Sequence, residues 1–343
     1  MIYIILKMNN NLSTNNNNLL GVNTNNIEGF NITEYYPDEN DKIKSLEKAG
    51  MIHKEVRRQL YDIIKPGMKL IDIAKFIEMK TEELNKKNNI NKGIGFPVSL
   101  GVNNCAAHWH PEANDTTTLK KDDIIKIDFG IEVNSWIIDC AFTAYFNHKH
   151  DNLAHAVGEA TNTGIRNAGI DVDINEWAQD IQEVMLSYNI NPITNLGGHN
   201  IQKGIIHGGM FLPSVPNKNL VYKRFTEGVY AIETFGSTQD DSTYESGEST
   251  LFRINPYVNP EFKLDTTKKF YNKLKSNFKT LPFTNRYIDT LNSYKTQLQI
   301  LTKNNSIHSY PPLYVNNGFV AQYEHTICIN ENNKIIFSQG DDY

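Results

Sequence analysis

The feature that most constrains the fold is a pair of aspartates inside an apolar, alternating segment at 124–146. Asp128 lies in DIIKIDFG and Asp139 in WIIDCAF, and the polar dipeptide Asn134-Ser135 separates the two runs. Alternation interrupted by turn residues predicts a β-hairpin. These strands are too apolar to form a surface ribbon, so we expect both carboxylates to lie in a sheet that is covered on both faces.

The expected hairpin brings the two carboxylates together. A turn between Val133 and Asn134 pairs Asp128 directly with Asp139. Directly opposed residues have Cβ atoms about 4.5 to 5.5 Å apart, and two ionised carboxylates at that distance repel in a poorly solvated sheet. A shared proton, a lysine or arginine, or a divalent metal could offset the charge, and an aspartate at a sheet edge could instead reach solvent. The hairpin alone leaves these alternatives open.

Further acidic and imidazole groups occupy similar settings. Glu233 lies inside VYAIETF and Glu324 inside FVAQYEHTICI, whereas His199 follows two glycines in LGGHNI, which predicts a loop. Taken singly, a buried glutamate is as often paired with an arginine, and a loop histidine is usually solvated. Taken together with the two aspartates, the set favours a pair of divalent ions such as Mn, Fe, Co or Zn, which accept oxygen ligands and one imidazole.

Helical and strand periodicities alternate along the chain in the order helix, helix, strands, and this order occurs twice. The pattern predicts an α+β protein of two similar halves. The Asn-rich residues 9–26 have too little apolar area to fold, so we expect a flexible tail at 1–34 and one domain at 35–343. Helices are expected at 41–64, 71–87, 153–168, 174–188, 266–278 and 284–302, and strands outside the hairpin at 229–235, 318–329 and 334–338.

Composition excludes several classes of protein. The 343 residues are 39% hydrophobic and 21% charged with a net charge of -5, which is typical of a folded protein and offers no broad attraction for nucleic acid. The lysines at 268, 269 and 273 are interpreted as a solvated helix face. The apolar start, residues 1–6, is far shorter than a membrane span. Three widely spaced cysteines predict reduced thiols in a cytoplasmic protein, with a disulfide as the weaker alternative.

The order Asp, Asp, His, Glu, Glu and its surroundings resemble the methionine aminopeptidases, specifically the type 2 branch of the pita-bread fold. The resemblance covers about residues 41–343 and implies the extra helical insertion of type 2 enzymes at about 250–308. The motifs that carry it are FPVSLGVNNCAAHWHP (96–111), KIDFG (126–130), IIDCAFT (137–143), GGHNI (197–201), IIHGG (205–209), YAIETFGST (230–238), YPPL (310–313), AQYEHT (321–326) and the closing GDDY.

The resemblance implies a metalloaminopeptidase that removes the initiator methionine of nascent chains when the second residue is small. Its metal ligands fall on Asp128, Asp139, His199, Glu233 and Glu324, with His199 and Glu233 on the second ion. Asp139 and Glu324 would bridge two divalent ions, and a water between the ions would be a usable hydroxide near neutral pH. Glu233 would take up the proton and deliver it to the leaving amine.

Two further histidines match substrate-binding positions of this family. His207 would donate to the scissile carbonyl oxygen, and His108 would hydrogen-bond the peptide nitrogen on the leaving side. His325 should point away from the site because neighbouring residues of a strand face opposite sides. The pocket for the methionine side chain matches Phe96, Ile206, Phe235 and Tyr310.

Two departures from the family pattern affect these expectations. The charged N-terminal extension of eukaryotic members is replaced by the Asn-rich tail, which weakens the case for ribosome association. The segment that carries a pocket histidine in animal members is YESGEST (244–250), without a histidine. The alternatives are an inactive pita-bread binding protein of the proliferation-associated type and a proline-specific pita-bread peptidase. All five ligand positions are filled, and the NNCAAHWHP and IIHGG contexts and the insertion favour the methionine enzyme. We expect this enzyme to be a cytoplasmic monomer.

Overall fold

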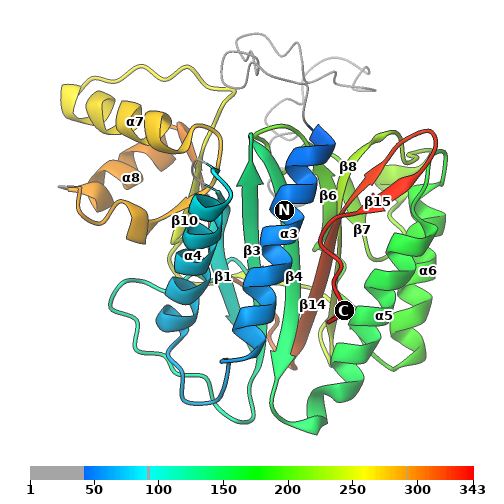
Figure 1. The fold of residues 1–343 in the computed structure, drawn as a ribbon. Coiled ribbons are helices and arrows are strands. Elements are labelled where there is room, and N and C mark those ends of the chain that lie inside the picture. The colour runs from blue at the N-terminus through cyan, green and yellow to red at the C-terminus, as the bar shows by residue number, and fades with distance from the viewer. Residues whose placement is uncertain (1–41, 91–92, 292) are drawn as a thin grey trace.

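The structure, a computed structural model, describes residues 42–90, 93–291 and 293–343. The expected tail at 1–34 lies outside the described residues. Figure 1 shows two pairs of helices, each followed along the chain by strands that meet at the centre of the molecule. The predicted α+β architecture is therefore confirmed.

The first half packs two helices against an antiparallel sheet. Helices α3 (Lys42–Tyr61) and α4 (Leu70–Lys87) precede β1 (Ile94–Val102), β3 (Ile124–Val133) and β4 (Trp136–Tyr145), which pair in the order β1-β3-β4. Apolar residues recur every three or four positions along α3, and this stripe packs on the sheet with the apolar residues of α4.

The second half repeats this plan. Helices α5 (Asp151–Asn167) and α6 (Ile174–Ser187) precede β6 (Gly197–Ile201) and β8 (Gly228–Ser237), and β14 (Val320–Ile329) completes the central strands. The sheet order is β15-β14-β8-β6-β7. The short edge and flanking strands are β5 (Asn191–Pro192), β7 (Phe211–Pro213) and β15 (Lys334–Ile336).

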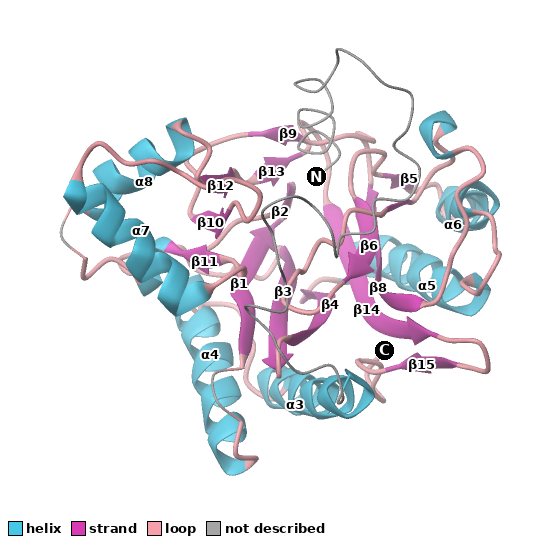
Figure 2. Cartoon of the chain, turned by 90° about the horizontal axis from the view of Figure 1, so that it is seen from above, coloured by secondary structure: helices cyan, strands magenta, loops and turns pink. Residues whose placement is uncertain are grey.

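The two halves meet where β4 lies beside β14. Seen from above, the central strands form one curved layer, with α3 along one part of its outer side and α5 along another (Figure 2). The strands are buried on both faces, as expected for a sheet that helices and loops cover together. This arrangement brings residues of β3, β4, β8 and β14 to a common centre.

The β3–β4 register differs from the predicted one. Asp128 pairs with Ala141 and Asp139 pairs with Gly130, so the two aspartates are diagonal neighbours instead of direct partners. The turn uses both Asn134 and Ser135, whose φ angles are 52° and 69°. Such a two-residue turn matches the twist of a hairpin. It shifts the pairing by two residues, and an even shift keeps both aspartates on the same face.

A third unit at the end of the molecule contains β10 (Leu251–Ile254), α7 (Asp265–Phe278), β11 (Phe283–Thr284), α8 (Tyr294–Lys303) and β12 (Ile307–Tyr310). Its strands pair in the order β11-β10-β12, and its helices pack on them around a separate apolar core (Figure 1). This unit lies within the predicted insertion at about 250–308. Nearby, β2 (Cys105–Ala107), β13 (Leu313–Tyr314) and β9 (Tyr244–Glu245) form a short sheet.

The predicted helix at 284–302 is wrong over its first half. The chain forms β11 and a single 3-10 turn before α8 begins at Tyr294. Tertiary contacts explain the difference, because the Arg286 guanidinium pairs with Glu78 Oε1 at 2.6 Å and the Tyr287 hydroxyl donates to the same oxygen at 2.8 Å. These contacts tie the segment to α4 and override its local periodicity.

Two simpler observations complete the fold. The cysteines at 105, 140 and 328 are free and buried, as the sequence predicts. Within the described ranges, no helix is both long enough and apolar enough to cross a membrane.

Candidate active site

The five predicted ligand residues come together from both halves of the fold. Asp128 and Asp139 belong to the β3–β4 hairpin, Glu233 to β8, Glu324 to β14 and His199 to β6. Glu233 and Glu324 are direct partners in the β8–β14 ladder and therefore share a face. The fold thus places four carboxylates and an imidazole around one centre.

His199 lies in a strand, so the predicted loop at this position is wrong. The preceding glycines allow the strand to pack closely on β8, because a Cβ atom on Gly198 would lie 2.2 Å from the carbonyl oxygen of Ala231. The ring is buried, and its Nε2 lies 3.3 Å from Asp139 Oδ2. The glycines signalled a close approach of two backbones, which the sequence interpretation took for a turn.

Two groups of potential metal ligands share one residue. Asp139, His199 and Glu324 form one group and Asp128, Glu233 and Glu324 the other, with the ligand atoms of each group within 4.8 Å of one another. A carboxylate common to two groups is the arrangement that a bridging ligand requires. The family resemblance assigns Glu233 to the ion of His199, whereas this geometry places its carboxylate with Asp128.

Burial makes this cluster unstable as a set of free anions. The pKa values of Asp128, Glu233 and Glu324 are raised well above the ordinary carboxyl range, first by burial and then by the neighbouring carboxylates. Of the described residues, none hydrogen-bonds Asp128 Oδ1 or either carboxylate oxygen of Glu324. Unpartnered buried oxygens and one imidazole are a donor set that fits divalent cations, and the residues present therefore fit the metal that the resemblance implies.

Gln322 is a site residue that the sequence analysis missed. Its Nε2 donates to Asp128 Oδ2 at 3.2 Å and to Glu233 Oε1 at 2.7 Å, and so connects one carboxylate from each half. The side chain is buried and lies two residues before Glu324 on β14. Strand alternation places residues i and i+2 on the same face, and this signal could have identified it.

The two predicted substrate histidines border the same centre. The His207 ring meets the His199 ring edge-on at 4.5 Å, and His108 packs edge-on against Tyr310 at 5.7 Å. Burial lowers the pKa of His108 to about 3 and that of His207 well below 6.5, the latter with a smaller contribution from the neighbouring His199 ring. Both rings are therefore neutral at pH 7, and a neutral imidazole has one N–H to donate.

His325 points away from this centre, as strand alternation predicts. Its Nδ1 lies 2.9 Å from the Ser338 hydroxyl, and its ring stacks on Tyr343 at 4.5 Å.

A cavity of about 60 Å³ opens between the ligands and apolar side chains. Phe96, Ile206 and Phe235 line it as predicted, whereas Tyr310 contacts His108 and is not among the described lining residues. The lining residues that the sequence analysis did not identify are Ser99, Ala107, His110, Leu196, Leu251 and Pro282.

A second, more open cavity of about 400 Å³ adjoins the first and shares His110 with it. Glu248 and Thr250, in the segment where animal relatives of the family carry a pocket histidine, line this second cavity. Leu251, the next residue, lines the first. In this region the first cavity is therefore lined by Leu251 of β10 and not by the loop that precedes it.

The model of metallopeptidase family M24 matches residues 44–331. The chain belongs to this family. Curated relatives include methionine aminopeptidase 2 of Komagataella phaffii, 42% identical over 89% of this chain and 72% of that protein. Methionine aminopeptidase 2 of Puccinia graminis is 40% identical over 90% of this chain and 70% of that protein. These matches confirm the predicted resemblance to type 2 methionine aminopeptidases.

Solved structures agree on the fold. A thermophilic Arx1 superposes with a TM-score of 0.80 at 18% identity, covering 89% of this chain and 92% of that one. The methionine aminopeptidase of Rickettsia prowazekii has a TM-score of 0.60 at 18% identity, covering 89% of this chain and 99% of the other. The predicted pita-bread fold is therefore confirmed.

Proposed function

We propose that this chain removes the initiator methionine from nascent polypeptides whose second residue is small. Membership of family M24 and about 40% identity to proteins named methionine aminopeptidase 2 support a metal-dependent aminopeptidase. One observation carries the proposal furthest. A buried set of ligand side chains, with carboxylate oxygens that have no hydrogen-bond partner in the described chain, borders a small cavity with apolar walls.

The proposed cofactor is a pair of divalent ions, drawn from Mn, Fe, Co or Zn. Asp128, Asp139, His199, Glu233 and Glu324 would hold them, with Glu324 common to the two groups. Bound ions would supply a water of lowered pKa for attack on the peptide carbonyl. Ligation of the free α-amine of the substrate would restrict cleavage to the first residue.

The protein's own side chains would handle the proton and the substrate. Glu233, held by the Gln322 amide at 2.7 Å, would receive a proton and return it to the leaving amine. His207, neutral because of its burial, would donate to the carbonyl oxygen as negative charge develops there. His108 would hydrogen-bond the peptide nitrogen on the leaving side.

The apolar walls would select the methionine side chain. Phe96, Ile206 and Phe235 face the cavity from three different parts of the chain, and Leu251 adds a wall from β10. The cavity is small, and apolar contact with a wall of this kind discriminates by about 1 to 3 kcal/mol for each methylene group. Methionine should therefore be preferred over shorter or branched side chains.

Cleavage of Met-Ala-Ser compared with an Xaa-Pro dipeptide tests the proposal. We expect release of methionine from the tripeptide, complete loss with a chelator, and recovery when Co²⁺ is returned. Cleavage of the Xaa-Pro dipeptide alone would favour the proline-specific alternative. A protein that binds Co²⁺ but cleaves neither peptide would favour the inactive binding protein.

The proposed location is the cytoplasm, because nascent polypeptides carry their initiator methionine there. The three buried, free thiols are compatible with a reducing compartment.

A further inference from the structure

In the described part of the chain, side chains and not a backbone ladder join the two halves of the molecule where β4 lies beside β14. We call this boundary the seam, and it consists of residues 139–143 of β4 facing residues 322–326 of β14. Among the described strands, no backbone ladder pairs β4 with β14. Side-chain hydroxyl groups connect the two strands instead.

The first and last connections are made by threonines. The Thr326 hydroxyl accepts from the Asp139 backbone N–H at 2.8 Å and donates to the Asp139 carbonyl at 2.6 Å. The Thr143 hydroxyl does the same with Gln322, accepting from its N–H at 2.9 Å and donating to its carbonyl at 2.8 Å. Each threonine therefore satisfies both backbone groups of the residue opposite to it.

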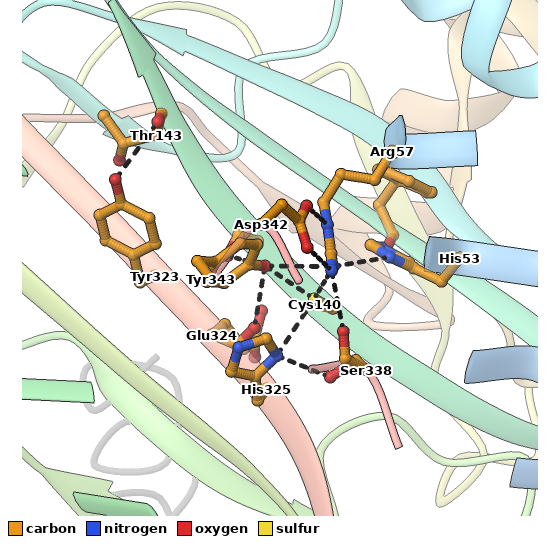
Figure 3. Close-up of polar contacts among 12 residues, drawn as sticks. His53, Arg57, Cys140, Thr143, Tyr323, Glu324, His325, Ser338, Asp342 and Tyr343 are labelled. Carbon is orange, nitrogen blue, oxygen red and sulfur yellow. Dashed lines mark hydrogen bonds and ion pairs between the residues drawn. The ribbon is translucent and has the colours of Figure 1, made fainter. Parts of the chain in front are cut away.

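The C-terminal residue supplies the connection between these two. The Tyr343 hydroxyl donates to the Ala141 carbonyl of β4 at 2.9 Å and lies 3.5 Å from the Glu324 carbonyl of β14 (Figure 3). Ala141 and Glu324 are each two residues from the positions that the threonines bridge. These three hydroxyl groups span the seam at every second residue, and the middle one comes from outside both strands. The Tyr323 hydroxyl of β14 adds a fourth contact, 3.4 Å from the Thr143 carbonyl of β4 (Figure 3).

Several contacts hold the tyrosine in this position. Its ring stacks on His325 at 4.5 Å, and the Arg57 guanidinium lies 4.5 Å from the ring centre. The same guanidinium pairs with Asp342, with Nη2 2.7 Å from Oδ1, and donates to the Ser338 carbonyl at 3.0 Å. Arg57 is fully buried, so the C-terminal segment provides the counter-charge for a cation inside the protein.

The hydroxyl of Tyr343 is also placed by a thiol. Cys140 Sγ lies 3.0 Å from it, and Arg57 Nη1 lies 3.5 Å away. A hydroxyl has one proton to donate and two lone pairs to accept with. The hydroxyl shares its single proton between the Ala141 carbonyl at 2.9 Å and the Glu324 carbonyl at 3.5 Å, and it can accept from both of these neighbours.

The seam determines how the proposed ligands from the two halves approach each other. Asp139 and Glu324, which carry ligand atoms within 4.8 Å of each other, are themselves seam residues. Gln322, which the Thr143 hydroxyl bridges, contacts the carboxylates of Asp128 and Glu233. A change in the separation of β4 and β14 would move one ligand set relative to the other. The hydroxyl groups are polar contacts that oppose a separation of β4 from β14.

We propose that Tyr343 is a positioning residue that fixes the spacing of the two ligand sets, so that metal affinity depends on the docking of the segment 338–343. The proposal rests on the metal site of the proposed function. Partners behind metal ligands typically change affinity or activity by about 10- to 100-fold when they are removed. Tyr343 contacts the backbone of both strands, β4 and β14, and among the described residues it makes no hydrogen bond to the ligand carboxylates themselves.

The test compares Tyr343→Phe with Tyr230→Phe. The first removes the seam hydroxyl and keeps the ring that packs on His325 and Arg57. The second removes an equivalent buried bond, because the Tyr230 hydroxyl donates to the Thr226 carbonyl at 2.9 Å away from the seam. Apoprotein is titrated with Co²⁺ alone, followed by calorimetry and by the visible absorption of the bound ion. Thermal unfolding of the apoproteins and kcat and KM on Met-Ala-Ser complete the set.

We expect Tyr343→Phe to weaken Co²⁺ binding by about 10-fold or more and to change the visible spectrum. Its kcat should fall while KM stays near that of the unmodified protein. Tyr230→Phe should lose a similar amount of apoprotein stability with unchanged Co²⁺ binding. Thr326→Val, which removes a neighbouring seam hydroxyl, should also weaken Co²⁺ binding, and Asp342→Asn should produce a smaller loss.

Unchanged Co²⁺ affinity and spectrum in Tyr343→Phe, whatever its stability, would overturn the proposal. Equal weakening in Tyr230→Phe would also overturn it, because the effect would then follow general stability. If Tyr343→Phe does not fold, unchanged Co²⁺ binding by Thr326→Val and Asp342→Asn decides against the proposal. Absence of Co²⁺ binding by the unmodified protein would instead count against the proposed function.

Discussion

The seam and the unit at 251–310 have opposite interiors, one polar and one apolar. The seam gathers buried carboxylates, one histidine and hydroxyl groups between β4 and β14. The second unit encloses an apolar core between its strands and its two helices. Its largest buried side chains include Phe252, Phe270, Tyr271, Leu274 and Phe283.

This difference separates two tasks within one chain. Buried charges that lack partners oppose folding, so the seam is stable only where bonds or ions compensate its charges. Burial of apolar area stabilises the second unit without any such requirement. The second unit also contributes Leu251 to the cavity wall, whereas the seam contributes the potential metal ligands Asp139 and Glu324. Substitutions in the two regions should therefore differ in what they change.

The largest effect is expected at the seam itself. Asp139→Asn removes a charge from the residue that lies closest to His199, and the site should lose metal and with it all cleavage of Met-Ala-Ser. Asp123→Asn is the matched control, because this buried carboxylate accepts from the Lys120 backbone N–H at 2.8 Å and belongs to no ligand group. Metal content by atomic absorption and turnover decide the matter. Near-normal values in Asp139→Asn would contradict the metal site.

A core substitution in the second unit should lower the stability of the protein and leave its metal site intact. Leu274 is fully buried there, and Leu274→Ala should lower the free energy of unfolding by about 2 to 5 kcal/mol through lost contacts and a cavity. Co²⁺ affinity should be unchanged. Urea unfolding and a Co²⁺ titration of the same sample measure both. A parallel loss of affinity would show that the two regions do not separate as described.

The two histidines that meet edge-on provide a finer comparison within the site. His199→Ala should lose metal because it removes a ligand. His207→Ala should keep metal and lose turnover worth about 2.7 to 4 kcal/mol, the usual range for a donor to developing negative charge. Metal content and single-turnover rates distinguish the two variants. Equal metal content in both would mean that the roles are assigned wrongly.

Acid should lower the free energy of unfolding through the buried histidines near the site. Burial lowers the pKa of His110 from 6.5 to about 3, so the folded protein binds fewer protons than the unfolded chain between these values. Stability is then complete above pH 6.5 and falls by about 1.4 kcal/mol per pH unit for this group as pH decreases toward 3. His110→Gln should reduce that slope in urea unfolding. His148→Gln, at an exposed ring, should not, and equal slopes in all three proteins would contradict the assignment.

Much of the fold could be predicted because its signals are local. Apolar spacing along α3, α4, α5 and α6 predicted these helices to within a few residues, since each helix buries one continuous stripe. Alternation around Asp128 and Asp139 predicted a buried hairpin with both carboxylates on one face. The register was wrong by two residues because the number of residues in a turn cannot be read from apolar alternation. The face was still correct, since alternation has a period of two.

The sequence by itself therefore determined which residues could serve the proposed site and which faces of the strands they occupy. It did not determine how the two halves meet. Gln322, Thr143 and Thr326 are ordinary strand residues until β4 lies beside β14, and their partners across that boundary are 179 to 194 positions away. The role of Tyr343 is equally invisible in the sequence, because the short polar segment that carries it, residues 339–343, has no periodicity to interpret. Only the tertiary structure brings these groups together, because the contacts that decide it join distant parts of the chain.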